Sequence, residues 1–103
     1  MLSAMSKRLT GKTVLITGAS SGIGRSTALE FARAAKTDIK LILLARRTDR
    51  LEELKNQIEK ETCNGARVMC ARLDISQKNE IKKFTDDLKT SEWGNVDILV
   101  NNA

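Results

Sequence analysis

The segment TVLITGASSGIGR, Thr13–Arg25, decides the fold of this chain. It opens with a short run of β-branched residues and leucine, which is typical of a buried strand. Three glycines follow, Gly18, Gly22 and Gly24, and a helix-like segment begins within them. A glycine-rich bend between a strand and a helix lets an anion approach the unpaired N–H groups at the helix N-terminus. The rest of the sequence decides whether the bend belongs to a nucleotide-binding fold.

The chain has 103 residues, which is enough for one small domain, and its hydrophobic content of 41% and charged content of 30% are typical of a soluble protein. No stretch approaches the ~20 apolar residues that cross a bilayer, so we expect no membrane partner. The N-terminal segment MLSAMSKRLTGK lacks the apolar region of a secretory signal. We expect a cytoplasmic protein, with a basic mitochondrial presequence as the alternative.

Cysteine and histidine usage argues against a disulfide framework and against a metal site. The two cysteines, Cys63 and Cys70, lack C-x-x-C spacing, and the sequence contains no histidine. We expect both thiols to be reduced and Cys70, which lies in an apolar run, to be buried.

The net charge of +5 raises the question of a nucleic-acid partner. The basic residues are interspersed with acids in segments such as DRLEELKNQIEKE, which is typical of a solvated helix face. One tryptophan, two phenylalanines and no tyrosine provide no platform on which bases could stack. We therefore expect no nucleic-acid partner.

Strand-like and helix-like segments alternate along the chain. Nearly continuous apolar runs predict strands over residues 13–17, 39–45, 66–73 and 96–100. Helical spacing predicts helices over residues 22–35, 48–62 and 76–89, with Thr48 or Asp49 capping the second and Ser76 capping the third. The residues expected on the inner helix faces are Ile23, Phe31, Ala32 and Ala35 in the first, Leu51, Leu54 and Ile58 in the second, and Ile81, Phe84 and Leu88 in the third.

This alternation predicts an α/β domain with a parallel sheet. Right-handed crossovers lead to strand order 3-2-1-4, the first half of a Rossmann-type doubly wound sheet. The chain reverses direction between the first and fourth strands, and ligands of such folds bind at the carboxyl ends of those strands. The glycine bend follows the first strand and therefore lies at that point.

The spacing of the glycines, G-x-x-x-G-x-G, differs from the commoner G-x-G-x-x-G fingerprint. Gly18 permits the sharp turn out of the strand, whereas Gly22 and Gly24 allow a diphosphate to approach and the helix to pack closely. Ser20 and Ser21 add hydroxyl groups that cap the helix or bind an anion. The alternative is a bend that only joins strand to helix. A P-loop is excluded, because no Lys-Ser or Lys-Thr pair follows the last glycine.

The motif TGASSGIG, residues 17–24, resembles the cofactor signature of the short-chain dehydrogenase/reductases. Three further motifs agree with that family in order and spacing: Ala45-Arg46-Arg47, Leu73-Asp74-Ile75 and Asn101-Asn102-Ala103. The resemblance extends from about Leu9 to the end. Within the family, KLILLARRTDRLEELK, residues 40–55, is most similar to fungal NADP-dependent 3-hydroxy acid dehydrogenases.

The end of the second strand favours NADP over NAD as the cofactor. An NAD-specific site commonly places an acid there, where it binds the ribose hydroxyls. This sequence has Ala45, followed by Arg46 and Arg47. A guanidinium binds a phosphate through two parallel hydrogen bonds, whereas an acid would repel the 2′-phosphate. The alternative is that both arginines only mark the solvated start of a helix.

The resemblance also implies individual roles. Asp74 would bind the adenine amino group with the Ile75 backbone beside it, and Asn101 would contact the ribose through its backbone. Asn102 would brace neighbouring strands, Ile23 would contact the diphosphate through its main chain, and Ser20 would approach the 2′-phosphate. The complete set expected to bind the cofactor is Gly18, Ser20, Ser21, Gly22, Ile23, Gly24, Arg46, Arg47, Asp74, Ile75, Asn101 and Ala103.

The family transfers hydride to or from alcohols using a tyrosine in a Y-x-x-x-K motif, an upstream serine and a further asparagine. This chain contains no tyrosine, so we expect no catalytic residue within it. We expect residues 1–12 to be an extension and residues 13–103 to be a cofactor-binding half-domain. The parent enzyme is expected to be a homo-oligomer acting on a small hydroxy acid or alcohol. The alternatives are a non-catalytic NADP-binding module and a small basic interaction protein without a nucleotide.

Overall fold

The computed structural model describes residues 9–35 and 38–102. Its elements follow the chain in strict alternation: β1 (Thr13–Thr17), α2 (Gly22–Ala35), β2 (Ile39–Ala45), α3 (Asp49–Glu61), β3 (Ala66–Arg72), α4 (Lys78–Lys89) and β4 (Ile98–Val100). The predicted bounds of the first two strands and the first helix are confirmed.

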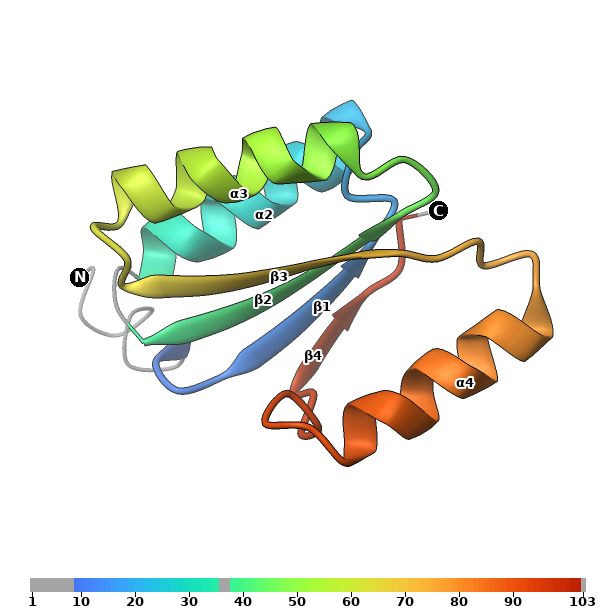
Figure 1. The fold of residues 1–103 in the computed structure, drawn as a ribbon. Coiled ribbons are helices and arrows are strands. Elements are labelled where there is room, and N and C mark those ends of the chain that lie inside the picture. Colours follow the sequence, from blue (N-terminus) through green and yellow to red (C-terminus); the bar gives the residue numbers. More distant parts are fainter. Residues whose placement is uncertain (1–8, 36–37, 103) are drawn as a thin grey trace.

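The strands form one parallel sheet in the order β3-β2-β1-β4, as predicted (Figure 1). Thr13 lies opposite Lys40, and Val14 lies opposite Ile98, so β1 is central and is flanked by both halves of the sheet. The carboxyl ends of β1 and β4 meet at the point where the strand order reverses. This is the Rossmann-type arrangement that the alternation of elements predicts.

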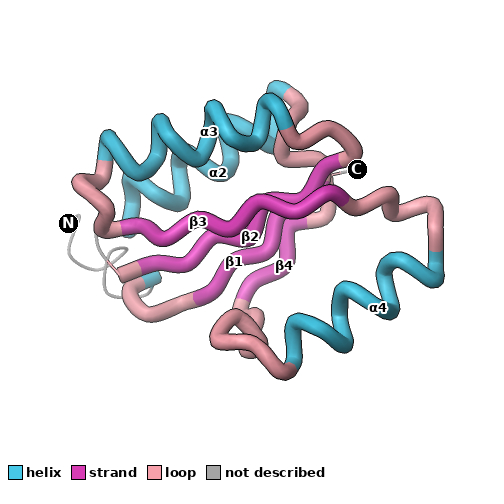
Figure 2. Tube along the Cα trace, in the orientation of Figure 1, coloured by secondary structure: helices cyan, strands magenta, loops and turns pink. Residues whose placement is uncertain are grey.

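Helices cover both faces of the sheet unequally. Figure 1 shows α2 and α3 packed side by side on one face and α4 alone on the other, and the tube in Figure 2 shows the same layers. The larger core lies under α2 and α3, because β1 and β2 alternate their side chains between the faces. Its fully or almost fully buried members include Val14, Ile16, Ala28, Ala32, Leu41, Leu43, Leu51, Leu54 and Ile58.

The second core, under α4, is smaller. It contains the buried residues Ile42, Leu44, Leu73 and Leu88. Two other members of the predicted α4 stripe, Ile81 and Phe84, pack against it but are only partly buried. The predicted inner face of α4 is therefore confirmed, although this helix is less deeply embedded than α3.

The start of α4 differs from the prediction, which placed its cap at Ser76. The Ser76 hydroxyl instead donates to Asp74 Oδ1 at 2.7 Å, and the Gln77 N–H donates to the Asp74 carbonyl at 3.0 Å. Because the Ser76 hydroxyl is bonded to Asp74 in this turn, it does not cap the helix. Gln77 is the N-cap, and the helix begins at Lys78. Thr48 does occupy the N-cap of α3, but its side chain makes no capping hydrogen bond.

The fourth strand begins at Ile98, not at residue 96 as predicted. The side chain of Asp97 is the reason, because its Oδ2 accepts the Thr13 N–H at 2.8 Å. The Asp97 N–H in turn donates to the Thr13 carbonyl at 2.8 Å. These two hydrogen bonds between Thr13 and Asp97 hold the chain against β1 just before β4. The regular backbone ladder between the strands begins only at Ile98.

Two predicted burials are also wrong. Ile23 is 73% exposed, whereas Ala32 and Ala35 are buried as predicted, together with Gly24 and Ala28, and Phe31 is half-buried against the larger core. Cys70 is only half-buried, because β3 lies at the edge of the sheet. Both cysteines are free.

The N-terminal extension predicted for residues 1–12 is largely outside the described residues. Within it, Leu9 is 7% exposed and belongs to the larger core. Gly11 has φ +80°, a left-handed conformation that suits glycine, and its N–H donates to the Asp38 carbonyl. Residues 9–12 thus contribute to packing at the amino edge of the sheet.

Candidate functional site

The candidate site begins at Thr17, the last residue of the central strand. Its hydroxyl donates to Asn101 Oδ1 at 3.0 Å and accepts the Asn102 N–H at 3.0 Å. Thr17 is 8% exposed, and these part-buried hydrogen bonds join β1 to the end of β4. They set the position of the bend that follows β1.

The bend turns sharply at Gly18, whose φ of +62° lies in the left-handed region. The Ser21 N–H donates to the Gly18 carbonyl at 3.2 Å and closes the turn. The Ala19 N–H donates to the Leu44 carbonyl at 3.1 Å and holds the bend against β2. The predicted role of Gly18 in the turn is therefore confirmed by its geometry.

Ser21 caps α2. Its hydroxyl accepts the Gly24 N–H at 3.4 Å and donates to the Gly18 carbonyl at 2.8 Å. The side-chain amide of Asn102 donates to the same hydroxyl at 2.9 Å and to the Gly18 carbonyl at 3.3 Å. Asn102 therefore braces the bend as well as the strands.

The first N–H groups of α2 remain available. No acceptor among the described residues takes a hydrogen bond from the backbone N–H of Gly22 or Ile23. These groups carry the partial positive charge of the helix N-terminus. Ile23 is itself 73% exposed. The arrangement suits an anionic ligand.

The two helical glycines have different structural roles. A Cβ on Gly24 would lie 2.3 Å from the Gly18 carbonyl oxygen and 2.8 Å from Asn102 Nδ2. A Cβ on Gly22 would meet nothing within 4 Å. Gly24 is therefore required for packing of the bend, whereas Gly22 keeps open the space in front of the helix N-terminus.

Arg46 and Arg47 are exposed in the segment between β2 and α3. Neither guanidinium forms an ion pair within the part of the chain that the structure describes. The Arg46 carbonyl accepts a hydrogen bond from Arg72 Nε at 3.2 Å, which ties this segment to the end of β3. No acid occupies the end of β2, since Ala45 is the last residue of that strand.

Asp74, Ile75 and Asn101 lie beyond the carboxyl ends of β3 and β4. Hydrogen bonds from the hydroxyl and the N–H of Ser76 lower the pKa of the Asp74 carboxyl, so it is held as a carboxylate acceptor. Ile75 is 40% exposed and lines, together with Asn101, a groove of about 580 Å³ between α4 and the sheet. Ala103 lies outside the described residues.

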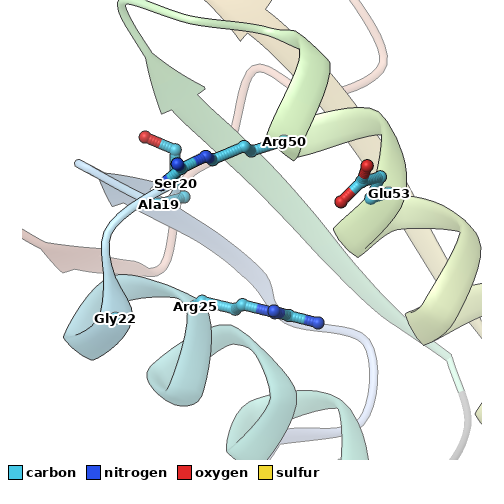
Figure 3. A pocket seen from close by; sticks show the side chains of 6 residues that line it. All are labelled: Ala19, Ser20, Gly22, Arg25, Arg50 and Glu53. Atoms are coloured by element: carbon cyan, nitrogen blue, oxygen red, sulfur yellow. The ribbon is translucent and has the colours of Figure 1, made fainter.

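A second, smaller pocket of about 230 Å³ lies on the opposite side of the bend, between the N-terminal turns of α2 and α3 (Figure 3). It brings together two predicted site residues, Ser20 and Gly22, and three charged residues that were not predicted as part of the site. These three are Arg25, Arg50 and Glu53. Arg50 and Glu53 lie in a segment of mixed charge that is typical of a solvated helix face. Only the packing of α2 beside α3 brings them and Arg25 together beside the bend.

The described residues contain no helix long and apolar enough to cross a membrane. Within residues 9–35 and 38–102, no group of three or more His, Cys, Asp or Glu side chains is placed to hold a metal ion.

Comparison with known proteins identifies the family. The model of the short chain dehydrogenase family matches residues 12–103. The NADP-dependent 3-hydroxy acid dehydrogenase of Schizosaccharomyces pombe is 46% identical over 96 residues, which cover 93% of this chain and 35% of that protein.

Two solved structures have the same fold. L-sorbose reductase from Gluconobacter frateurii, in complex with NADPH and L-sorbose, aligns with a TM-score of 0.78 and 35% identity, covering 92% of this chain and 34% of that one. A short-chain dehydrogenase from Sphingobium yanoikuyae in complex with NADPH aligns with a TM-score of 0.73 and 36% identity, covering 89% and 34%. This chain thus spans about a third of the length of the relatives it matches. The motifs, the strand order and these matches agree, and the chain belongs to the short-chain dehydrogenase family.

Proposed function

We propose that this chain binds NADP(H) at the carboxyl edge of its sheet and is the cofactor-binding half of an oxidoreductase. The cofactor would supply or accept a hydride in exchange with a small hydroxy acid or alcohol. The observation that carries the proposal is the pair of N–H groups, on Gly22 and Ile23 at the N-terminus of α2, that have no acceptor among the described residues. They lie at the reversal of strand order, where Rossmann-type folds bind dinucleotides.

The diphosphate would lie against these N–H groups. Gly22 leaves the approach open, because no described atom lies within 4 Å of the position of its missing Cβ. The hydroxyl of Ser21 is already engaged in three hydrogen bonds within the bend, so we assign it to supporting the site. The bend is thereby fixed before the ligand arrives, which reduces the entropic cost of binding.

The phosphorylated cofactor is favoured by the charge at the end of β2. Ala45 offers no carboxylate to the ribose, and the exposed Arg46 and Arg47 follow it without an acid partner in the described ranges. The S. pombe relative is named NADP-dependent, and both structural relatives were solved with NADPH. We assign Arg46 to the 2′-phosphate, with Arg47 beside it.

The adenosine would lie along the ends of β3 and β4. The Asp74 carboxylate would accept from the adenine amino group, Ile75 would contact the ring through its backbone, and Asn101 and Ala103 would approach the ribose. The depressed pKa of Asp74 supports its role as an acceptor.

We assign no catalytic residue to this chain, which contains no tyrosine. That observation favours one second candidate, a module that holds NADP without turnover. An assay of the complete gene product with NADP and a panel of 3-hydroxy acids and alcohols distinguishes the enzyme from the non-catalytic module. Reduction of NADP supports the enzyme, whereas tight binding without reduction supports the module. We also propose that the enzyme is cytoplasmic and homo-oligomeric and that it has no nucleic-acid partner.

Titration of the complete gene product with NADPH and NADH, followed by the fluorescence of the reduced nicotinamide, tests the proposal. We expect NADPH to bind at least about tenfold more tightly than NADH, corresponding to the ~1.4 kcal/mol of one phosphate–guanidinium interaction. A folded protein that binds neither nucleotide would refute the proposed function.

A further inference from the structure

Trp93 is the single tryptophan of the chain and lies in the connection between α4 and β4. Its side chain is half-buried and packs against the second core, under α4. Two cations from the sheet lie over its ring. Lys40 Nζ is 5.6 Å from the ring centre, and the guanidinium carbon of Arg67 is 5.5 Å from it. At these distances the face of an indole ring attracts a cation.

The neighbouring residue, Glu92, binds the same two cations. Lys40 Nζ donates to the Glu92 carbonyl at 3.1 Å, and Arg67 Nη2 pairs with Glu92 Oε1 at 2.7 Å. Lys40 belongs to β2 and Arg67 to β3, whereas the connection leads into β4 on the other side of β1. Residues 92 and 93 are therefore fixed to two strands beside which β4 does not lie.

The connection is also tied to the last turn of α4. The Ser91 hydroxyl donates to the Leu88 carbonyl at 2.7 Å and accepts the Trp93 N–H at 3.1 Å. A Cβ on Gly94 would lie 2.9 Å from the Leu88 carbonyl oxygen, so the chain passes the end of the helix without spare room. A force on Trp93 therefore acts directly on the end of α4.

The first turn of α4 follows the Asp74 turn, at the opposite edge of the sheet. The Gln77 N–H donates to the Asp74 carbonyl at 3.0 Å, and the helix begins at the next residue. Between its two ends α4 borders the groove of about 580 Å³, and Leu88 is its one buried residue among those described. Its 12 residues form a rod of about 18 Å. Displacement of the last turn therefore also displaces the first.

We propose that Trp93, with Lys40 and Arg67 over its ring, is a latch that holds α4 over the groove and fixes the Asp74 turn at the other end of the helix. The consequence for ligands rests on the proposed function, in which Asp74 accepts from adenine. Release of the latch would move this acceptor. NADPH and NADH both contain adenine, so both would bind more weakly.

Hydrogen exchange of the complete gene product, without nucleotide, tests the latch. Trp93→Leu removes the ring and keeps an apolar side chain. We expect the amides of α4 and of Ser76 and Gln77 to exchange about tenfold faster, which is the ~1.4 kcal/mol of two exposed cation–π contacts. The amides of α3 should stay within about twofold of their rates in the unmodified protein, because α3 lies on the other face of the sheet.

Three further variants separate the ring from the ion pair beside it. Glu92→Gln is the matched control, since it removes an exposed ion pair and leaves the ring and both cations. It should change exchange in α4 by less than about twofold. The double variant Lys40→Met, Arg67→Met removes both cations and should reproduce the effect of Trp93→Leu. Trp93→Phe keeps an aromatic face and should accelerate exchange by less than about threefold.

Titration of the same proteins with NADPH and NADH tests the effect on the Asp74 turn. Trp93→Leu should raise both dissociation constants by one common factor of at least about three, because the competent position of the turn is less populated. Trp93→Phe should restore both constants in part. A loss confined to NADPH would locate the effect at the 2′-phosphate and overturn the inference.

The exchange and binding results decide the inference separately from the proposed function. If Trp93→Leu leaves exchange in α4 within about twofold of the unmodified protein, the ring does not hold the helix, and the latch is refuted. If α4 exchanges faster while Ser76, Gln77 and both dissociation constants are unchanged, the latch does not reach the Asp74 turn, and the inference is overturned. Failure of the unmodified protein to bind either nucleotide refutes the proposed function, whereas the exchange rates still decide the latch.

Discussion

Gly22 and Gly24 are separated by one residue, yet the structure requires a missing side chain at only one of them for packing. At Gly24 the Gly18 carbonyl and the Asn102 amide occupy the space of a Cβ. At Gly22 that space is open, so its absent side chain serves an approaching ligand. The motif therefore combines a structural glycine with one that the proposed function requires.

Gly24→Ala should destabilise the protein by about 1–3 kcal/mol, because backbone atoms of the bend must move away from the new methyl group. Gly22→Ala should stay within about 0.5 kcal/mol of the unmodified protein, since the methyl group meets open space. Urea denaturation of both variants measures the difference. Equal losses of stability would contradict the separation of roles.

The two thiols should also behave differently. Burial is the main cause that raises the pKa of Cys70 to about 11, and the carboxylates of Glu52 and Glu59 add to it. The Cys70 thiol donates to the Leu51 carbonyl at 3.3 Å, whereas Cys63 is exposed in the turn after α3. A thiol reagent near neutral pH should therefore modify Cys63 first.

The sign of the pH effect follows from the raised pKa. Above pH 9.0, the ordinary pKa of a cysteine thiol, the unfolded chain releases a proton that folded Cys70 retains up to its pKa of about 11. Cys70 therefore lowers the free energy of unfolding progressively as the pH rises from 9.0 to about 11. Urea denaturation across this range should show a smaller decline for Cys70→Ala than for the unmodified protein. If the free energy of unfolding declines equally in both proteins, the raised pKa of Cys70 is contradicted.

At the residue scale, sequence motifs predicted the bend but not its surroundings. Gly18, Ser21 and Asn102 form the hydrogen bonds that their motif positions suggest. The position of Arg50 in the pocket beside the bend was not predicted. That position depends on the packing of α3 beside α2, which helical spacing alone does not specify. Ile23 was wrongly expected in the core, because apolar character does not distinguish a helix end from a helix face.

At the scale of elements, the strands were the most predictable feature. Continuous apolar runs define β1 and β2, because both strands are covered on both faces. The starts of α4 and β4 were less predictable, since the side chains of Asp74 and Asp97 form hydrogen bonds there that hydrophobic spacing does not indicate. Such local competition between side chains and backbone is not visible in hydrophobic periodicity.

The helices should differ in local stability. α3 buries Leu51, Leu54 and Ile58 at no more than 1% exposure, whereas α4 buries only Leu88. Fewer buried apolar side chains lower the free energy of local opening. Hydrogen exchange should therefore show the amides of α4 exchanging at least about tenfold faster than those of α3. Equal protection would show that α4 is held as firmly as the helices on the other face.

A substitution in each helix tests the same difference. Leu54→Ala should cost about 2–5 kcal/mol, because it leaves a cavity in the larger core. Phe84→Ala, at a half-buried position of α4, should cost clearly less than the ~3–5 kcal/mol of a fully buried phenylalanine. Chemical denaturation of both variants provides the comparison, and a larger loss for Phe84→Ala would contradict it.

At the scale of the whole molecule, the two faces of the sheet are unequally covered. The groove of about 580 Å³ beside α4 is lined by apolar side chains of the sheet and of the helix, including Leu15, Phe84 and Leu99, and Leu99 is 64% exposed. β4 also forms an open edge of the sheet. Exposed apolar surface and a free strand edge both favour association.

The 103-residue polypeptide, produced alone, should therefore self-associate or bind a hydrophobic dye such as ANS. Sedimentation velocity over a range of concentrations measures the first property, and dye fluorescence the second. A monomer that unfolds in a single cooperative thermal transition and binds no dye would show that the groove is less accessible than the structure indicates.

The central claim is that the N-terminus of α2 binds the diphosphate of a pyridine nucleotide. The most direct test is an NMR titration of the isotopically labelled complete gene product with NADPH, following the backbone amides. We predict that the largest shifts occur at Gly22 and Ile23, whose N–H groups have no acceptor in the described structure. Saturating NADPH that leaves these amides unshifted in a folded protein would contradict the account.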